Sequence, residues 1–420
     1  MSATPSRNRL RVALVEWNWT GHHSAYFASF AEVLCTIGCE TLAICPCADE
    51  VEAAWLVKSR DTARAPIHFM PFAAPTLNMR PRRWHGMVNA ILSFRWIRSA
   101  LRNWEARNGC KLDLVFFACI YDWDFRYLPR TASGFPWPWS GLYLHCRDFR
   151  MPGTPLPYTR MMPCPERIFR HSNLQSVAIL DEGADEYMQR LTNGRPVVVF
   201  PDLANASAPA PGGVACRMKE FAAGRPLVGA FGHLQPTKGV TALAQVALNP
   251  ENRHLAFAFV GEVMLGLFST DDRQLIDQLR STPNVFAHFE RVTDGPAFNA
   301  LVRNCDIIFA AYTNFPNSSN MLTKAALFEK PVIVSDGYLM AERVRGYALG
   351  EVIPEGNVEA LNSAIRALCD NTRRTGEKRQ PQWERYREAH SSARLAEAFT
   401  RLLGSIKREK SNASVSSPGC

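Results

Sequence analysis

The sequence predicts an α/β protein made of two consecutive doubly wound domains, each a parallel sheet covered by helices. First, its 420 residues are more than one ordinary core accommodates, so two domains of about 150–200 residues are expected. Second, short apolar runs alternate with helical patterns in both halves, which is typical of parallel sheets with helices on their faces. Third, residues 202–213 are rich in Ala, Pro, Ser and Gly, which indicates a linker between the halves.

The first half begins with a strand at 11–15, a turn that contains glycine, a helix at 24–38 and a second strand at 41–45. This βαβ order favours a parallel sheet. Further strand-like runs follow at 114–119, 141–145, 176–180 and 197–200. We therefore expect a first domain at 1–202 and a linker at 203–224.

The second half repeats this alternation. Strands are expected at 227–231, 256–261, 285–289, 307–310 and 331–334, and helices at 216–223, 240–247, 272–280, 296–303 and 321–328. A second domain at 225–380 follows, then one long helix (381–408) that crosses back to the first domain, and a disordered tail at 409–420. Because ligands bind at the carboxyl ends of the strands in such sheets, the two domains are expected to face a shared cleft.

Charge, cysteine content and hydropathy restrict the functional class and the compartment. The net charge of +9 favours anionic partners, namely nucleotide phosphates, lipid surfaces or nucleic acid, without choosing among them. The twelve cysteines are scattered and lack Cys-x2-Cys spacing, so we expect reduced thiols in a reducing compartment. The sequence shows no signal peptide and no run of about 18 apolar residues that could span a membrane. These observations predict a cytoplasmic protein.

The start of the second domain, LVGAFGHLQPTKGVTAL at 227–243, has the features of a phosphate-binding turn. Gly232 lets backbone amides approach a diphosphate, and Lys238 at the entrance of the next helix supplies a compensating charge. Glycine turns between a strand and a helix are common in Rossmann-like domains. The alternative is therefore a simple tight turn with a solvated lysine.

A polar cluster precedes the helix expected at 321–328. Its members are Asn317, Ser318, Ser319 and Asn320. Short hydroxyl and amide side chains cap a helix start, and the free N–H groups and dipole of that helix stabilise a phosphate. The alternative is that these residues cap the helix and do nothing more.

These motifs resemble those of the retaining GT-B glycosyltransferases of glycosyltransferase family 4. GHLQPTKG at 232–239 is similar to the family's Gly-Arg-Leu-x-x-x-Lys-Gly loop. KAALFEKPVIVSDGYLMAERV at 324–344 is similar to its Glu-Ala-x-Ala-x-Gly-x-Pro-Val-Ile-Ala-Ser signature and the continuation Gly-Gly-x-x-Glu-x-Val, and EVIPEGNVEALNSAI at 351–365 is similar to the stretch after it. The likeness covers most of 225–370. It implies a GT-B fold and the retaining, metal-independent transfer of a sugar from a nucleotide-diphosphate sugar to a hydroxyl acceptor, with no further cofactor.

The resemblance also implies roles for residues on the donor side. His233 stands where the family has an arginine, and Lys238 is retained; in the family these two basic residues hold the donor diphosphate. The family's paired glutamates, which lie near the donor sugar and its ribose, are replaced by Pro316 and Lys324. We therefore hypothesise that Lys324 joins the 318–320 loop in a phosphate clamp. The alternative is that Lys324 is a surface residue of its helix.

In the first half, the segment WNWTGHHSAYFASFAEVL resembles the family's turn after the first strand. Gly21, His22 and His23 form a candidate loop for the acceptor or the donor phosphate, because a turn without side chains can approach a ligand closely. Neighbouring histidines point different ways on a helix, and no carboxylate or cysteine stands at ligand spacing, so we expect no metal here.

His145 is the candidate catalytic residue. It stands at the end of the strand expected at 141–145, where residues of the cleft lie. The resemblance implies that it donates a hydrogen bond near the anomeric carbon of the donor sugar. The alternative is a structural histidine at a strand end.

The segment 80–111 combines an apolar face with a stripe of arginines at 95, 98 and 102. Basic amphipathic helices bind anionic membranes, so peripheral contact with the cytoplasmic face of a membrane is one interpretation. The other is that the apolar face packs on the sheet and the arginines face water.

The sequence therefore predicts a glycosyltransferase that binds a nucleotide sugar and a hydroxyl acceptor, which could be a glycan, a lipid-linked sugar or a small molecule. The alternative is an inactive nucleotide-sugar-binding or scaffold protein with the same fold, and the missing glutamates are its best support. Nucleic acid is not an expected partner, because the basic and aromatic motifs of known modules are lacking.

Overall fold

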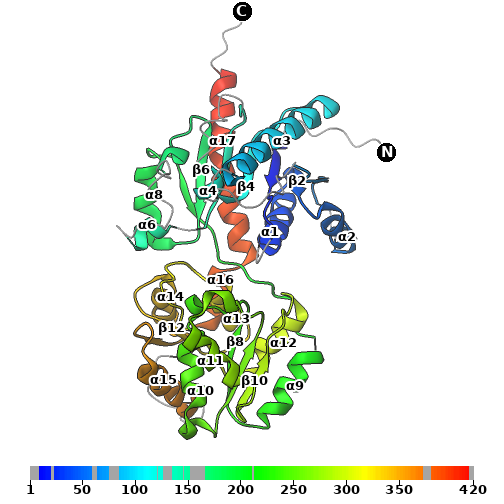
Figure 1. The fold of residues 1–420 in the computed structure, drawn as a ribbon. Helices are drawn as coiled ribbons and strands as arrows, with labels where there is room; N and C mark the ends of the chain where they lie inside the picture. The colour runs from blue at the N-terminus through cyan, green and yellow to red at the C-terminus, as the bar shows by residue number, and fades with distance from the viewer. Residues whose placement is uncertain are drawn as a thin grey trace, which may run out of the picture. The chain divides into compact units, whose positions relative to one another are not determined.

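The computed structural model describes residues 9–19, 23–58, 64–74, 85–120, 122–125, 135–144, 146–151, 166–210, 212–371 and 380–415. The chain forms two compact units (Figure 1). The first unit comprises residues 1–201 and 391–420, and the second comprises residues 202–390. We call them the first and the second domain.

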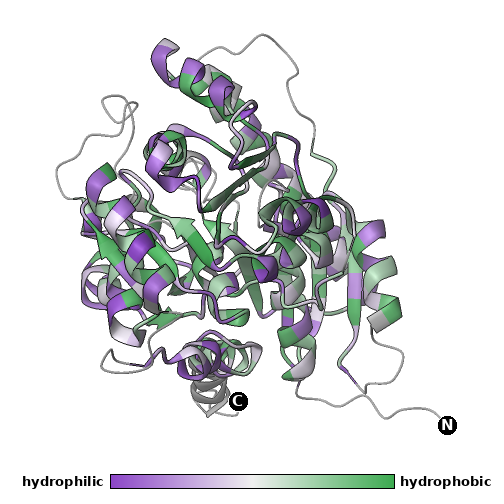
Figure 2. Cartoon of the chain, turned by 90° about the horizontal axis from the view of Figure 1, so that it is seen from below, coloured by the Kyte–Doolittle hydropathy of each residue, from purple (hydrophilic) through white to green (hydrophobic). Residues whose placement is uncertain are grey.

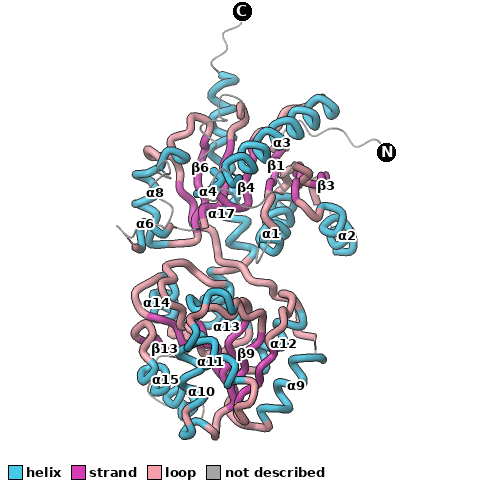
Figure 3. Tube along the Cα trace, in the orientation of Figure 1, coloured by secondary structure: helices cyan, strands magenta, loops and turns pink. Residues whose placement is uncertain are grey.

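The first domain contains a seven-stranded parallel sheet in the order β3-β2-β1-β4-β5-β6-β7 (Figure 3). The strands are β1 (Arg11–Val15), β2 (Glu40–Cys45), β3 (Ile67–Pro71), β4 (Leu114–Ile120), β5 (Trp139–Tyr143), β6 (Leu174–Ile179) and β7 (Val197–Val199). Every residue of β4 is buried, as expected for an apolar strand covered on both faces. The sequence prediction lacks β3, because this edge strand is only partly buried and forms no apolar run.

The helices of the first domain connect and cover these strands. They are α1 (His23–Thr36), α2 (Ala48–Lys58), α3 (His85–Asn108), α4 (Asp122–Phe125), α6 (Arg147–Arg150), α7 (Glu166–Phe169), α8 (Asp185–Leu191) and α17 (Ser392–Val415), with a 3-10 turn at Glu182–Ala184. Phe399 of α17 packs against Phe30, Phe116 and Phe200, with ring centroids 4.8 to 5.5 Å apart. The last helix is therefore part of the core of the first domain.

Helix α3 lies within the segment considered for membrane contact. Its Phe94, Ile97 and Leu101 are fully buried in the core with the sheet, whereas Arg95 and Arg102 are exposed. The described apolar face of α3 is thus occupied by the domain itself, as the second interpretation expects. No helix among the described residues is both long enough and apolar enough to cross a bilayer.

The second domain contains a six-stranded parallel sheet in the order β10-β9-β8-β11-β12-β13. The strands are β8 (Leu227–Phe231), β9 (Ala256–Val260), β10 (Val285–His288), β11 (Ile307–Ala310), β12 (Val332–Ser335) and β13 (Gly350–Ile353). The half-exposed edge strand β13 is absent from the sequence prediction for the same reason as β3.

Helices cover both faces of this second sheet. On one face the core includes residues of α9 (Gly213–Ala222), α12 (Pro296–Asn304), α13 (Asn320–Leu327), α14 (Leu339–Tyr347) and α16 (Trp383–Ala389); on the other it includes residues of α10 (Val240–Leu248), α11 (Thr270–Leu279) and α15 (Val358–Asn371). Short 3-10 turns lie at Pro236–Lys238, Pro250–Asn252 and Leu265–Leu267. Many strand residues have the green colour of hydrophobic side chains (Figure 2).

Three boundaries differ from the sequence prediction. The expected linker at 203–224 contains α9, whose Met218 is fully buried in the core of the second domain. The single helix expected at 381–408 is two helices: α16 packs in the second domain through Tyr386, and α17 belongs to the first. Helix α17 also continues to Val415, through most of the tail that was expected to be disordered.

Candidate functional site

The order of the second sheet locates a candidate ligand site. Strand β8 lies between β9 and β11. The chain runs outward from β8 through β9 to β10, then crosses back to β11 on the other side of β8 and runs outward through β12 to β13. In open α/β sheets, ligands bind beyond the carboxyl ends of the strands at this switch point. The two loops that follow β8 and β11, residues 232–239 and 311–319, both begin there.

These two loops are joined tightly. The N–H of Thr313 donates to the carbonyl of Thr237 at 3.0 Å, and the Thr313 hydroxyl donates to the carbonyl of Pro236 at 3.2 Å. A Cβ added to Gly239 would lie 2.2 Å from the carbonyl oxygen of Ala311, and its φ is +66°. Only glycine therefore permits this approach of the two backbones.

The side chain of Lys238, in the first loop, packs on the second loop. Its Nζ is 3.8 Å from the ring centroid of Tyr312 and 5.0 Å from that of Phe315. A cation over an aromatic face is held electrostatically. Lys238 thus packs against two aromatic rings. This contact disagrees with the alternative, in which the lysine is freely solvated. Gly232, with φ of +95°, starts the same loop, and the half-exposed side chain of His233 lies 3.7 Å from Glu262.

The start of α13 carries the predicted polar cluster. Ser319 is the N-cap, and its hydroxyl accepts from the N–H of Met321 at 3.3 Å. Asn317 and Asn320 are half-buried. Ser318 donates to the carboxylate of Asp202 and accepts from Nη1 of Arg343 at 2.6 Å. One hydroxyl of the cluster is therefore engaged inside the domain.

Lys324 is not a surface residue, so that alternative is wrong. Its side chain is 1% exposed, and its Nζ lies 2.7 Å from Asp294 and 2.7 Å from Oδ1 of Asn299. It also donates to the carbonyl of Asn205 at 3.3 Å. Burial lowers the pKa of Lys324, against the effect of Asp294. The structure gives this ammonium partners within its own domain.

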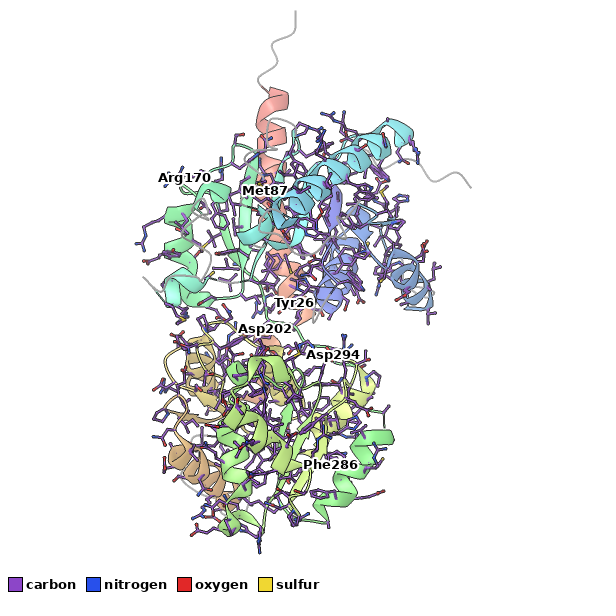
Figure 4. All side chains as sticks on the ribbon, in the orientation of Figure 1. Tyr26, Met87, Arg170, Asp202, Phe286 and Asp294 are labelled. Atoms are coloured by element: carbon purple, nitrogen blue, oxygen red, sulfur yellow. The ribbon has the colours of Figure 1, made fainter. Side chains whose placement is uncertain are left out.

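Asp294 is a residue that the sequence analysis missed. It lies between β10 and α12 (Figure 4), and its side chain is 32% exposed although its partner Lys324 is buried. No local pattern marks an aspartate in a loop. Only its contact with Lys324 in the folded chain marks Asp294 as a candidate site residue.

In the first domain, three predicted residues lie outside the described residues: Gly21, His22 and the catalytic candidate His145. His23 is described. Its Nδ1 lies 3.0 Å from Oε2 of Glu16, and both side chains are buried.

Cys119 completes a group with Glu16 and His23, in which one potential ligand atom of each residue lies within 4.8 Å of the others. Burial, and then the charge of Glu16, raise the pKa of the Cys119 thiol well above its usual value. No carboxylate or cysteine stands at ligand spacing from His23 in the sequence, but Glu16 and Cys119 lie beside it in the folded chain. Glu16 follows β1 and Cys119 lies on β4, so the fold, not sequence spacing, brings them together.

The comparisons with known proteins rest on structure. No protein-family model matches the sequence, and no curated protein sequence matches it. The structure is similar to the sucrose-phosphate synthase of Thermosynechococcus elongatus, with a TM-score of 0.60 and 15% identity over 97% of this chain and 100% of that one. It is similar to Anabaena HepE in complex with UDP-glucose, with a TM-score of 0.65 and 14% identity over 94% and 100%.

A third similar structure is the UDP-forming α,α-trehalose-phosphate synthase of Burkholderia vietnamiensis, with a TM-score of 0.60 and 10% identity over 97% of this chain and 100% of that one. All three are GT-B glycosyltransferase structures that are matched over nearly their full length. Their likeness agrees with the two parallel sheets described above. The predicted fold class is thus confirmed: this chain has the two-domain, Rossmann-like GT-B fold.

Proposed function

We propose that this protein transfers a sugar from a nucleotide-diphosphate sugar to a hydroxyl acceptor. One observation carries the proposal: the loops after β8 and β11 meet at the switch point of the second sheet, where Lys238 of the first loop packs on Tyr312 of the second. This arrangement suits an anionic ligand. Anabaena HepE, which has the same fold, has been crystallised with UDP-glucose.

In the proposed reaction the bond between the anomeric carbon and the diphosphate oxygen breaks, and the acceptor oxygen bonds to that carbon and loses its proton. The leaving nucleoside diphosphate gains negative charge, so stabilising that charge is the main task of the enzyme. Backbone amides of the Gly232 loop, the amino end of α13 and Lys238 would do this without a metal or another cofactor. His233, half-exposed in the same loop, is available for the same diphosphate.

The contact between Lys324 and Asp294 suggests which residue takes the place of a missing glutamate. Lys324 stands where the resemblance implies a glutamate, but Asp294 places a carboxylate 2.7 Å from the Lys324 ammonium. We propose that Asp294, partly exposed and held by the buried lysine, accepts hydrogen bonds from hydroxyl groups of the donor. The lysine then orients Asp294 and does not contact the phosphates itself.

The stereochemistry and the acceptor side rest on the resemblance. We propose retention of the anomeric configuration, with His145 next to the anomeric carbon and the turn at Gly21–His23 toward the acceptor. We place the reaction in the cytoplasm, because all ten cysteines that the structure describes are free, as a reducing compartment would keep them.

Thermal unfolding in the presence of a panel of nucleoside diphosphates tests the proposal. One diphosphate is expected to raise the unfolding midpoint, because a ligand that binds only the folded state stabilises it. The matching radiolabelled nucleotide sugars are then tested for transfer or hydrolysis. Stabilisation without either reaction would support the inactive binding protein, and no stabilisation by any diphosphate would contradict both functions.

A further inference from the structure

Three side chains with metal-binding chemistry converge in the first domain. Glu16 directly follows β1, His23 is the first residue of α1, and Cys119 lies near the end of β4. Their exposed fractions are 2%, 6% and 3%. One ligand atom of each lies within 4.8 Å of the other two, so the three are close enough together to contact one metal ion.

The group lies at the switch point of its sheet. Strand β1 pairs with β2 on one side and with β4 on the other, and Glu16 and Cys119 lie at or near the carboxyl ends of β1 and β4. The carboxyl ends of strands at a switch point are the usual place for ligands in open α/β sheets.

The strand that carries Cys119 is irregular there. Phe117 pairs with Gly141 and Ile120 pairs with Tyr143, so β4 has one residue more than β5 between these two pairs. Such a bulge changes the direction of the side chains within it. A Cβ on Gly141 would lie 2.7 Å from the Phe117 carbonyl oxygen, so the bulge also requires a glycine on the neighbouring strand.

We propose that Glu16, His23 and Cys119 bind a divalent transition metal, with Zn²⁺ as the best fit. Thiolate and imidazole ligands favour zinc, whereas magnesium and calcium prefer oxygen ligands alone. Three protein ligands leave one tetrahedral position for a water or another oxygen. Binding replaces the contact between Glu16 and His23 by bonds to the metal, and the thiol of Cys119 releases its proton to solvent.

A second contact supports the carboxylate of Glu16. The N–H of Asn18 donates to Oε1 at 2.9 Å, while Oε2 faces His23. Hydrogen bonds of this kind orient the ligands of a metal. The ion would join β1, β4 and the start of α1, and so would fix both ends of the connection between Glu16 and His23. This site takes no part in holding the donor diphosphate, which the proposed function assigns to the second domain.

The metal content of the full-length protein tests this inference independently of any activity. After incubation with zinc and exhaustive buffer exchange, elemental analysis is expected to find one zinc per wild-type chain. The Cys119→Ala and Glu16→Gln variants are expected to lose it. The matched control is Cys305→Ala, which removes an equally buried thiol in the second domain and should keep the metal. Cobalt(II) should give a thiolate-to-metal charge-transfer band in the wild type and the control, but not in Cys119→Ala.

Two results would overturn the inference: a wild-type chain that retains no zinc or cobalt, or full metal content in both Cys119→Ala and Glu16→Gln. If those variants fold poorly, the unfolding midpoint of the wild-type protein still tests the site. Its unfolding midpoint should be higher with zinc than with a chelator. An unchanged midpoint together with no retained metal rejects the site, whatever the nucleotide panel shows.

Discussion

The backbone N–H of Asp202 donates to Nδ1 of His390 at 3.0 Å, although the two residues are 188 positions apart. Asp202 is the first residue of the second domain and His390 is the last. The Asp202 carboxylate also lies 3.1 Å from Nη1 of Arg343, and the Thr323 hydroxyl donates to the Asp202 carbonyl at 3.0 Å. The two ends of the domain are therefore joined to each other, to α13 and to α14.

This contact predicts a pH dependence of stability. Burial, and then the charge of Arg343, lower the pKa of His390 to about 3, although Asp202 acts in the opposite direction. Below the ordinary histidine pKa of about 6.5, the unfolded chain takes up a proton that the folded chain does not. The contribution of His390 to the free energy of unfolding should therefore be complete above about pH 6.5. About 2 kcal/mol of that free energy should be lost between pH 7 and pH 5.

The measurement is urea unfolding of the wild type and of His390→Gln at both pH values. Glutamine can still accept the hydrogen bond but does not titrate, so the variant should lose less stability on acidification. His254→Gln, at an exposed histidine, is the control and should behave like the wild type. Equal losses in all three proteins would show that His390 does not contribute.

Lys238→Ala should weaken the binding of a nucleoside diphosphate. A hydrogen bond to a charged group contributes about 1.5–3 kcal/mol, which corresponds to a loss of roughly ten- to a hundredfold in affinity. Isothermal titration calorimetry of the wild type and the variant gives the ratio. Lys219→Ala removes an exposed lysine of α9 in the same domain and should leave the affinity unchanged. Equal affinities for the wild type and Lys238→Ala would reject the proposed site.

Lys324→Met should lower the stability more than the affinity for a diphosphate. The substitution removes the ammonium that contacts Asp294, Asn299 and Asn205, and we expect a loss of about 2 kcal/mol in the free energy of unfolding. Denaturant unfolding and calorimetry measure the two quantities separately. A fall in diphosphate affinity with unchanged stability would instead support the phosphate clamp predicted from the sequence.

Asp294→Asn should lower the affinity for the nucleotide sugar. The amide is a weaker acceptor for donor hydroxyls than the carboxylate, so a several-fold loss is expected. Asp277→Asn, at an exposed aspartate of α11, is the control. If Asp294→Asn binds the donor like the wild type, Asp294 does not take the place of the missing glutamates.

Gly239→Ala should disrupt the junction of the two donor loops. The added Cβ would meet the carbonyl of Ala311, whereas a Cβ at Gly224 would meet nothing within 4 Å. Both glycines have positive φ, so Gly224→Ala measures the backbone strain alone, about 1 kcal/mol. Gly239→Ala should be less stable than Gly224→Ala and should bind diphosphate more weakly. Equal stability and affinity of the two variants would mean that the close approach of the loops is unimportant.

The sequence predicts best those elements that are buried on both faces. Strands β1, β8 and β11 have the bounds that were predicted. A short apolar run that is buried on both faces can form few structures other than a strand. The edge strands β3 and β13 were not predicted, because a half-exposed strand does not require a continuous run of apolar residues. The break between α16 and α17 was not predicted for another reason. The helical sequence pattern continues through the point where the chain passes from the second domain to the first.

The candidate site was predicted less completely than the fold. Lys238 and Ser319 could be found because a glycine turn and a helix cap have local patterns. The burial of Lys324 and its pairing with Asp294 depend on the contact of two segments that the sequence does not place together. The same is true of Glu16, His23 and Cys119, which come from three segments of the first domain.

The return of α17 to the first domain has a consequence for biosynthesis. The rings of Phe30, Phe116 and Phe200 meet Phe399 only after residue 399 has left the ribosome. By then the whole of 202–390 has been translated. The domain that is made first is therefore completed last, and a ribosome that stalls beyond residue 390 leaves it with an aromatic surface uncovered.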